Sequence, residues 1–283
     1  MKITVPLFSR NRPASMLAVL TAMDALATGQ NEIVYPLIVD EDDERTIQRL
    51  DDWISDCPEV AKRVHPLIGK RAKVLNARMN EAALAYPADA YFFCPDDGFP
   101  LEQHWDRIFM AAHVQGLPAW CWQEKNDPGN PTFICVHQKW IDAIGHVFPE
   151  YFPYWFADTW IAEVHLLCFG KPIPIVNQLG MGGKRGTTQG MRDLGFWFKF
   201  FAHTRTERME EAKKLGRAHG FTVHEHERLH FLEQLGENDA RQLAAVPHYE
   251  KLFDANAAPA SATYLEAKAR AGEMMDRRVV VLQ

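Results

Sequence analysis

The sequence predicts an α/β protein in which helices flank a mostly parallel sheet and a helical C-terminal extension follows. Segments with strand-like and helix-like patterning alternate over residues 3–94, which is typical of a parallel sheet with crossover helices. Beyond residue 203 the chain changes to charged stretches with helical patterning. We therefore predict an α/β domain over residues 1–203 and a helical extension over residues 204–283.

The first elements of the chain have clear local signals. Residues 3–8 are mostly apolar and predict a strand. A helix is expected over 13–28, because Pro13 is favoured in a first helical turn and Gly29 can end a helix. The acidic run 41–44 suits the amino end of a second helix, since carboxylates there oppose the positive end of the helix dipole.

The remaining elements follow from apolar periodicity and turn residues. The helix expected over 71–86 carries apolar side chains at helical spacing on one face. Short apolar runs bounded by turn residues predict strands. The other expected strands are 32–39, 90–94, 118–122, 132–136 and 172–176, and the other expected helices are 41–55, 101–113 and one from about residue 158.

The composition of the 283-residue chain is that of an ordinary globular protein, with 47% hydrophobic and 24% charged residues. Its net charge of -6 argues against a protein that binds mainly through broad contact with nucleic acid phosphates. No apolar stretch is long enough to span a bilayer, and a strand pattern begins at the N-terminus without a leader, so we expect a cytoplasmic protein. The scattered cysteines predict neither disulfides nor a cysteine zinc site.

Acidic residues stand where expected strands end or a helix begins. Asp40 ends one strand, Asp96 and Asp97 follow another, and Asp158 opens a helix. The carboxyl ends of parallel strands meet at one sheet edge, where open α/β sheets bind ligands. There, Asp40 can accept an N–H of a nucleobase, Asp97 can hold a cation on a diphosphate, and Asp158 can take a proton from a hydroxyl. Each acid alone is also consistent with a turn or a helix cap.

The order of these motifs resembles the family 2-like glycosyltransferases of GT-A fold, in their bacterial and phage forms. The matching stretches are 4–13, 38–40, 69–70 with 75–76, 92–100 and 156–163. The resemblance implies a nucleotide-sugar donor, usually a uridine diphosphate sugar, a divalent cation (Mn²⁺ or Mg²⁺), and inverting transfer with Asp158 as the catalytic base. The donor-binding residues that it implies are Pro6, Ser9, Arg10, Arg12, Asp40, Lys70, Asn76 and Asp96.

Two positions depart from the family pattern. Pro95 stands where the usual Asp-x-Asp motif has an acid, so we expect Asp97 to be the metal ligand and Asp96 to support it. Many relatives carry a metal-binding histidine after the last strand, where this chain has Asn177 and Gln178. An amide oxygen coordinates a hard cation only weakly, so we expect Gln178 to be a weak second ligand.

The glycine-rich loop 180–186 offers cations that could supplement or replace the metal. It does not match a P-loop, because no Ser or Thr follows Lys184 directly. Glycines would allow such a loop to close over a diphosphate, and Lys184 and Arg185 could then neutralise the leaving group. A flexible surface loop with solvated charges explains the same residues.

Two other functions are consistent with the sequence. His226-Glu227-Arg228-Leu229-His230 matches the H-E-x-x-H pattern of zinc metallopeptidases, in which two histidines lie one helical turn apart. No third ligand stands out nearby, and a solvated helix explains the motif more simply. The other alternative is a non-catalytic binding protein on a GT-A-like fold, which Pro95 and Gln178 favour. A nucleotidyltransferase would be distinguished by release of pyrophosphate.

The acceptor is not identified by the sequence. A hydroxyl on a glycan, a lipid, a protein or a modified DNA base is equally consistent with a base at Asp158. The aromatic segments and the C-terminal helical segments offer surfaces for a homo-oligomer.

Overall fold

The computed structural model describes residues 1–71, 74–129, 131–153, 156–181, 193–250 and 261–279. Its contacts divide the chain into two compact units, which we describe separately. Unit 1 comprises Met1–Arg71, Arg78–Val147 and Ile173–Lys184, and unit 2 comprises Ala72–Ala77, Phe148–Pro172 and Arg185–Gln283.

Unit 1 contains a 10-stranded sheet. Its strands are β1 (Lys2–Thr4), β2 (Leu7–Phe8), β3 (Glu32–Asp40), β4 (Val64–Gly69), β5 (Ala90–Phe92), β6 (Cys94–Pro95), β7 (Gly98–Pro100), β8 (Ala119–Glu124), β9 (Phe133–His137) and β10 (Ile175–Met181). β4, β3, the β1–β2 segment and the β5–β6 segment pair in parallel. β9 runs antiparallel between β5 and β8, and β10 pairs in parallel with β8. The sheet confirms the predicted fold class.

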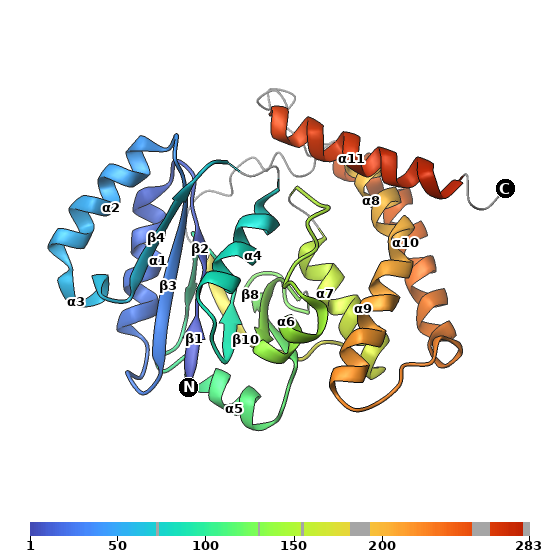
Figure 1. Ribbon diagram of the computed structural model, residues 1–283, viewed down its shortest axis with the longest axis horizontal. Helices are drawn as coiled ribbons and strands as arrows, with labels where there is room; N and C mark the ends of the chain where they lie inside the picture. The colour runs from blue at the N-terminus through green and yellow to red at the C-terminus, as the bar shows by residue number, and fades with distance from the viewer. Residues whose placement is uncertain (72–73, 130, 154–155, 182–192, 251–260, 280–283) are drawn as a thin grey trace. The chain divides into compact units, whose positions relative to one another are not determined.

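The helices of unit 1 are α1 (Pro13–Ala25), α2 (Glu44–Asp56), α3 (Pro58–Ala61), α4 (Leu75–Ala85), α5 (Arg107–Val114) and α6 (Gln138–Ile144), although α4 begins in residues that belong to unit 2. Figure 1 shows α1 and α2 side by side next to β3 and β4. The helix expected from residue 101 starts later, at Arg107. Asp106 instead accepts hydrogen bonds from the backbone and side chain of Thr28 and from Asn31, which holds this segment as a turn.

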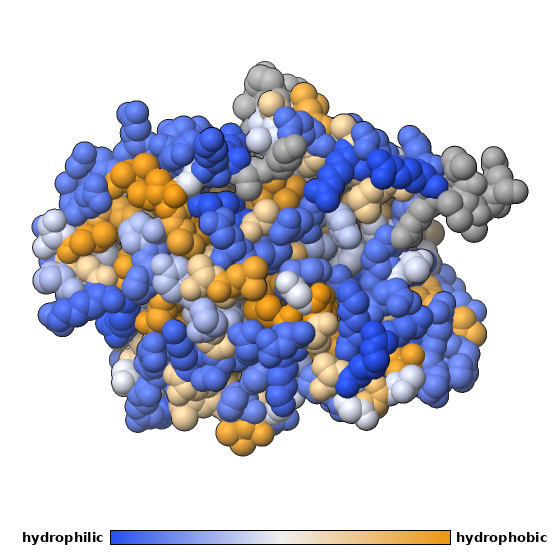
Figure 2. All heavy atoms as spheres, viewed as in Figure 1, coloured by the Kyte–Doolittle hydropathy of each residue, from blue (hydrophilic) through white to orange (hydrophobic). Residues whose placement is uncertain are grey.

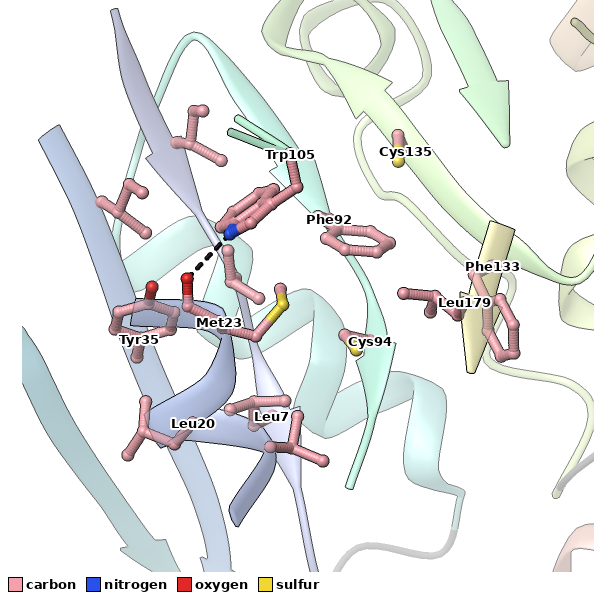
Figure 3. Close-up of a cluster of buried hydrophobic side chains, with 14 of the residues drawn as sticks. Leu7, Leu20, Met23, Tyr35, Phe92, Cys94, Trp105, Phe133, Cys135 and Leu179 are labelled. Atoms are coloured by element: carbon pink, nitrogen blue, oxygen red, sulfur yellow. Dashed lines mark hydrogen bonds between the residues drawn. The ribbon is translucent and has the colours of Figure 1, made fainter. Parts of the chain in front are cut away.

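The core of unit 1 lies between the sheet and its helices, as Figure 3 shows for part of it. Alternate side chains of the central strands point into this core, among them Leu7 and Phe92. Trp105 is 1% exposed and donates from Nε1 to the carbonyl of Met23 at 2.7 Å, so α1 is tied to the turn before α5. The rigid sheet that results fixes where each strand ends.

Unit 2 is helical over the part that the structure describes. Its elements are α7 (Ala157–Phe169), α8 (Leu194–His203), α9 (Arg205–Ala218), a short 3₁₀ helix (Glu225–Arg228), α10 (Leu229–Glu250) and α11 (Ala262–Val279). α7 packs on α9, and α8 contacts α9, α10 and α11. Because α7 and α8 pack with the later helices, this division differs from the domain boundary that we expected at residue 203.

No described helix combines the length and apolarity needed to cross a bilayer. The face drawn in Figure 2 is mostly hydrophilic, with apolar side chains scattered over it.

Candidate functional site

The parallel strands of unit 1 end together at one edge of the sheet. In the pairing register, Phe8 lies beside Ile38 on one side and Pro95 on the other, and Asp40 lies beside Gly69. The loops that follow these strands therefore meet at this edge, which we call the carboxyl edge. Residues of the predicted donor site at this edge are Ser9, Arg10, Arg12, Asp40, Lys70 and Asp96, and the predicted metal ligand Asp97 lies there too.

Arg12 holds both acids of the aspartate pair. Its Nη1 donates to Asp97 Oδ2 at 3.0 Å, and its Nη2 donates to Asp96 Oδ1. Asp96 is 1% exposed and Asp97 is 17% exposed, whereas Arg12 remains 44% exposed. One guanidinium thus bridges two neighbouring carboxylates, the geometry for which arginine is suited.

Burial perturbs Asp96 in spite of this contact. Desolvation raises the pKa of Asp96 to about 6, although Arg12 and the nearby Ser9 hydroxyl lower it. Ser9 is itself 1% exposed, and its backbone N–H donates to the Ile38 carbonyl at 3.3 Å. Asp96 is therefore a buried acid whose ionised form depends on a cation beside it.

A second arginine makes a similar contact on the next strand. Arg10 Nη1 lies 2.6 Å from Asp40 Oδ2, and the same guanidinium forms two hydrogen bonds with Asp42 at 2.7 and 2.9 Å. The contact with Arg10 lowers the pKa of Asp42. Asp40 therefore lies at the edge as predicted, with its carboxylate bound by Arg10.

Asp43 anchors the loop that carries both arginines. Its carboxylate caps α2, where it accepts from the Thr46 N–H at 3.2 Å and from the Thr46 hydroxyl at 2.6 Å. Asp43 Oδ2, the oxygen that binds the Thr46 hydroxyl, also accepts from the Asn11 backbone N–H at 2.7 Å. Asn11 has a φ of 58°. We interpreted the 41–44 run only as a helix-dipole signal. The cap spacing of Asp43 and Thr46 is visible in the sequence, whereas the contact with Asn11 is not.

The other predicted donor contacts have different surroundings. Pro6 is buried between β1 and β2, ahead of the loop at the edge. Asn76 is buried in unit 2, where its side-chain amide donates to the Pro149 carbonyl at 2.9 Å. Lys70 is exposed directly after β4, at the carboxyl edge.

Gln178 does not follow a strand, because the last strand is longer than we expected. β10 extends to Met181, held by β8 on one side and β7 on the other. Met181 pairs with Gly98, directly after Asp97, so Gln178 lies three residues earlier along the strand, about 10 Å away. This register separates Gln178 from the aspartate pair and corrects its expected place at the strand end. Lys184 and Arg185 lie outside the described residues.

Asp158 lies in unit 2, in the first turn of α7. The helix cap is Phe156, with a φ of 71°, so Asp158 is not the cap itself. Its Oδ1 accepts from the Thr159 N–H at 2.7 Å. Burial raises the pKa of Asp158, although that hydrogen bond lowers it. A carboxylate with a raised pKa is better suited to take a proton from a hydroxyl.

The H-E-x-x-H motif is not built as a zinc site. Residues 225–228 form a 3₁₀ helix and α10 begins only at Leu229, so His226 and His230 do not share a regular α-helix. Arg228 donates to the carbonyls of Leu167 and Cys168. No group of three or more His, Cys, Asp or Glu able to hold a metal occurs in the part of the chain that the structure describes. Within the motif, Arg228 therefore makes a structural contact with the end of α7.

The aspartate pair can hold a hard cation only if water and a bound phosphate supply the remaining ligands. It offers two carboxylates, and Mg²⁺ commonly takes one or two carboxylates together with water and the oxygens of a bound phosphate. Such a cation would have to compete with Arg12 for both carboxylates. The donor set is thus consistent with Mn²⁺ or Mg²⁺ bound together with a diphosphate.

Comparison with known proteins gives the fold. No family model and no curated protein matches the sequence. Among solved structures, glucosyl-3-phosphoglycerate synthase from Mycobacterium tuberculosis, solved with Mn²⁺, uridine diphosphate and glucosyl-3-phosphoglycerate, is 13% identical, with a TM-score of 0.50 over 74% of this chain and 80% of that one. TarS from S. aureus is 12% identical, with a TM-score of 0.51 over 78% of this chain and 44% of that one. These neighbours are glycosyltransferases of GT-A type, so the chain has the GT-A fold that we predicted.

Proposed function

We propose that this protein is a glycosyltransferase that moves a sugar from a nucleoside diphosphate donor, a uridine diphosphate sugar, to an acceptor hydroxyl. The observation that carries the proposal is the carboxyl edge of a GT-A sheet, where Arg12, Asp96 and Asp97 gather charges of both signs. The uridine diphosphate bound in the mycobacterial neighbour supports this donor class.

The residues at the edge have separate roles in this proposal. Asp97, supported by Asp96, would hold Mn²⁺ or Mg²⁺, and a bound cation would supply positive charge to the departing diphosphate. Arg10 and Asp40 are placed beside the same loop and would contact the nucleoside. Lys70 would add a further cation at the end of β4. Lys184 and Arg185 remain candidates for the diphosphate.

Asp158 would act as the base. A carboxylate near the acceptor takes the hydroxyl proton while the hydroxyl oxygen attacks the anomeric carbon and the bond to the diphosphate breaks. A direct displacement of this kind inverts the anomeric configuration, which NMR of the product can measure. The raised pKa of Asp158 supports the role.

The experiment is a donor screen with uridine, guanosine, thymidine and cytidine diphosphate sugars, with and without Mn²⁺ or Mg²⁺. We expect a free nucleoside diphosphate as product, with water as the default acceptor. Asp158→Asn should lower turnover by about 100-fold or more, the usual effect of losing a general base, with donor affinity unchanged. Asp276→Asn, which changes an exposed acid of α11, is the matched control. Full turnover by folded Asp158→Asn would contradict the assignment, and release of pyrophosphate would indicate a nucleotidyltransferase.

A further inference from the structure

Arg12 is placed so that its side chain can leave the aspartate pair without disturbing the fold. Its backbone carbonyl accepts from Met16 N–H at 3.2 Å at the start of α1, while its side chain makes no helix-capping bond. The backbone N–H of the preceding residue, Asn11, donates to Asp43 Oδ2 at 2.7 Å. The backbone of the loop is therefore anchored, and the half-exposed guanidinium is the part that is able to move.

The carboxylates that Arg12 binds are the same groups that a cation would need. Asp96 is almost completely covered, and Asp97 is mostly covered. Arg12 lies against Asp97 Oδ2 and Asp96 Oδ1, and a divalent cation at the same two oxygens would repel the guanidinium at such short separation. Binding of a cation between these two oxygens therefore includes the loss of the Arg12 contacts, and the guanidinium then needs another anion.

We propose that Arg12 is a displaceable counter-ion of the aspartate pair, which a divalent cation must replace, and that the donor diphosphate receives the displaced guanidinium. The second half of this proposal rests on the proposed function, whereas the displacement itself does not. Cation and nucleoside diphosphate then bind with positive coupling, and by thermodynamic reciprocity each raises the affinity of the other by the same factor. Arginine suits this exchange, because its planar fork can form two-pronged contacts with a carboxylate or with a phosphate.

The first test uses Mn²⁺ alone. Titration calorimetry at pH 8 compares the wild type with Arg12→Gln, Arg12→Lys and Arg49→Gln. We expect Arg12→Gln to bind Mn²⁺ about tenfold tighter than the wild type, because the competing charge is gone. Arg12→Lys should fall between them, since lysine keeps the charge but loses the two-pronged contact. Arg49→Gln is the matched control, because Arg49 is an exposed arginine of α2 whose carboxylate partner is Asp52, and the Mn²⁺ affinity of this variant should equal that of the wild type.

Two further arms make the result decisive. Arg12→Gln combined with Asp97→Asn should lose the gain in Mn²⁺ affinity, which assigns the gain to the pair. Uridine diphosphate should raise Mn²⁺ affinity by a larger factor in the wild type than in Arg12→Gln, because only the wild type has a guanidinium to transfer. Folded Arg12→Gln that binds Mn²⁺ no tighter than the wild type would overturn the proposal. Failure of every variant to bind uridine diphosphate would instead refute the proposed function, leaving the Mn²⁺ comparison to decide the displacement.

Discussion

Two arginines in this protein bind carboxylates in opposite environments. In unit 1, Arg12 is 44% exposed and bridges Asp96 and Asp97 at the sheet edge. In unit 2, Arg208 is 0% exposed, and its Nε lies 2.7 Å from Glu163 Oε2. The first contact can exchange with a ligand, whereas the second is closed to solvent. Residue type alone therefore does not separate a candidate site from a structural contact; burial does.

Arg208 makes further contacts within unit 2. Its Nη1 donates to the Phe201 carbonyl at 2.8 Å and to Thr204 Oγ1 at 3.1 Å. Its guanidinium lies 3.8 Å from the centre of the Phe201 ring and 5.2 Å from that of Trp160. Burial lowers the pKa of Arg208 and raises that of Glu163, so each charge depends on the other. This network joins α7, α8 and α9.

The largest effect should come from breaking the buried contact. Arg208→Met should lower the free energy of unfolding of unit 2 by about 3–5 kcal/mol, because it leaves Glu163 buried and unpaired. Urea unfolding followed by circular dichroism measures it. Adding Glu163→Leu should recover most of the loss, since an apolar pair of similar volume packs there. Lys213→Met, which removes an exposed contact with Glu210 on the same α9, should cost within about 0.5 kcal/mol. Equal losses from Arg208→Met and Lys213→Met would contradict the comparison.

The second effect is a pH dependence of the folding stability, which we expect from Asp96 beside Arg12. Asp96 has a pKa raised from 3.8 to about 6, so the folded protein keeps a proton that the unfolded chain releases. The stabilisation from this proton is complete below pH 3.8 and is lost as the pH rises through about 6. Between these values, the wild type should lose roughly 2 kcal/mol relative to Asp96→Asn. Denaturant midpoints measured across this range check the sign, and parallel curves for the two proteins would show that Asp96 does not titrate there.

The third effect concerns Asp43, which supports the loop at the carboxyl edge. Asp43→Ala removes the cap of α2 and the acceptor for Asn11, and should cost about 1–2 kcal/mol of stability. Donor affinity should fall as well, because the loop with Arg10 and Arg12 loses its support. Asp51→Ala, an exposed acid in the same helix, should change neither quantity. A stability loss without any change in donor affinity would restrict Asp43 to a capping role.

Local sequence signals were sufficient to predict the fold and some of the residues at the carboxyl edge. Alternating strand and helix patterns, Pro13 at a helix start, an acid at the end of β3 and two acids after β6 are local signals, and the GT-A fold confirms their combined prediction. The pairing of Arg12 with Asp96 and Asp97 joins residues 84 and 85 positions apart. No local pattern indicates such a contact, because it is created by two strands lying side by side.

The position where the last strand ends depended on the same long-range packing. We expected a strand over 172–176, yet β10 extends through Asn177 and Gln178 to Met181, because β7 and β8 pair with it on both sides. Hydrogen bonds to neighbouring strands therefore set the end of this strand. The donor-binding role of Asn76 stays a prediction; in unit 2 its amide donates to the Pro149 carbonyl.

In the function that we propose, the aspartate pair at the carboxyl edge binds a nucleotide-sugar donor through a divalent cation. The most direct test is the affinity of the wild type, Asp97→Asn and the control Asp51→Asn for uridine diphosphate sugars, measured by calorimetry with and without Mn²⁺. We predict Mn²⁺-dependent binding by the wild type and by Asp51→Asn, weakened by about tenfold or more in Asp97→Asn. Equal affinity of Asp97→Asn and the wild type, or no binding of any nucleoside diphosphate sugar, would contradict the claim.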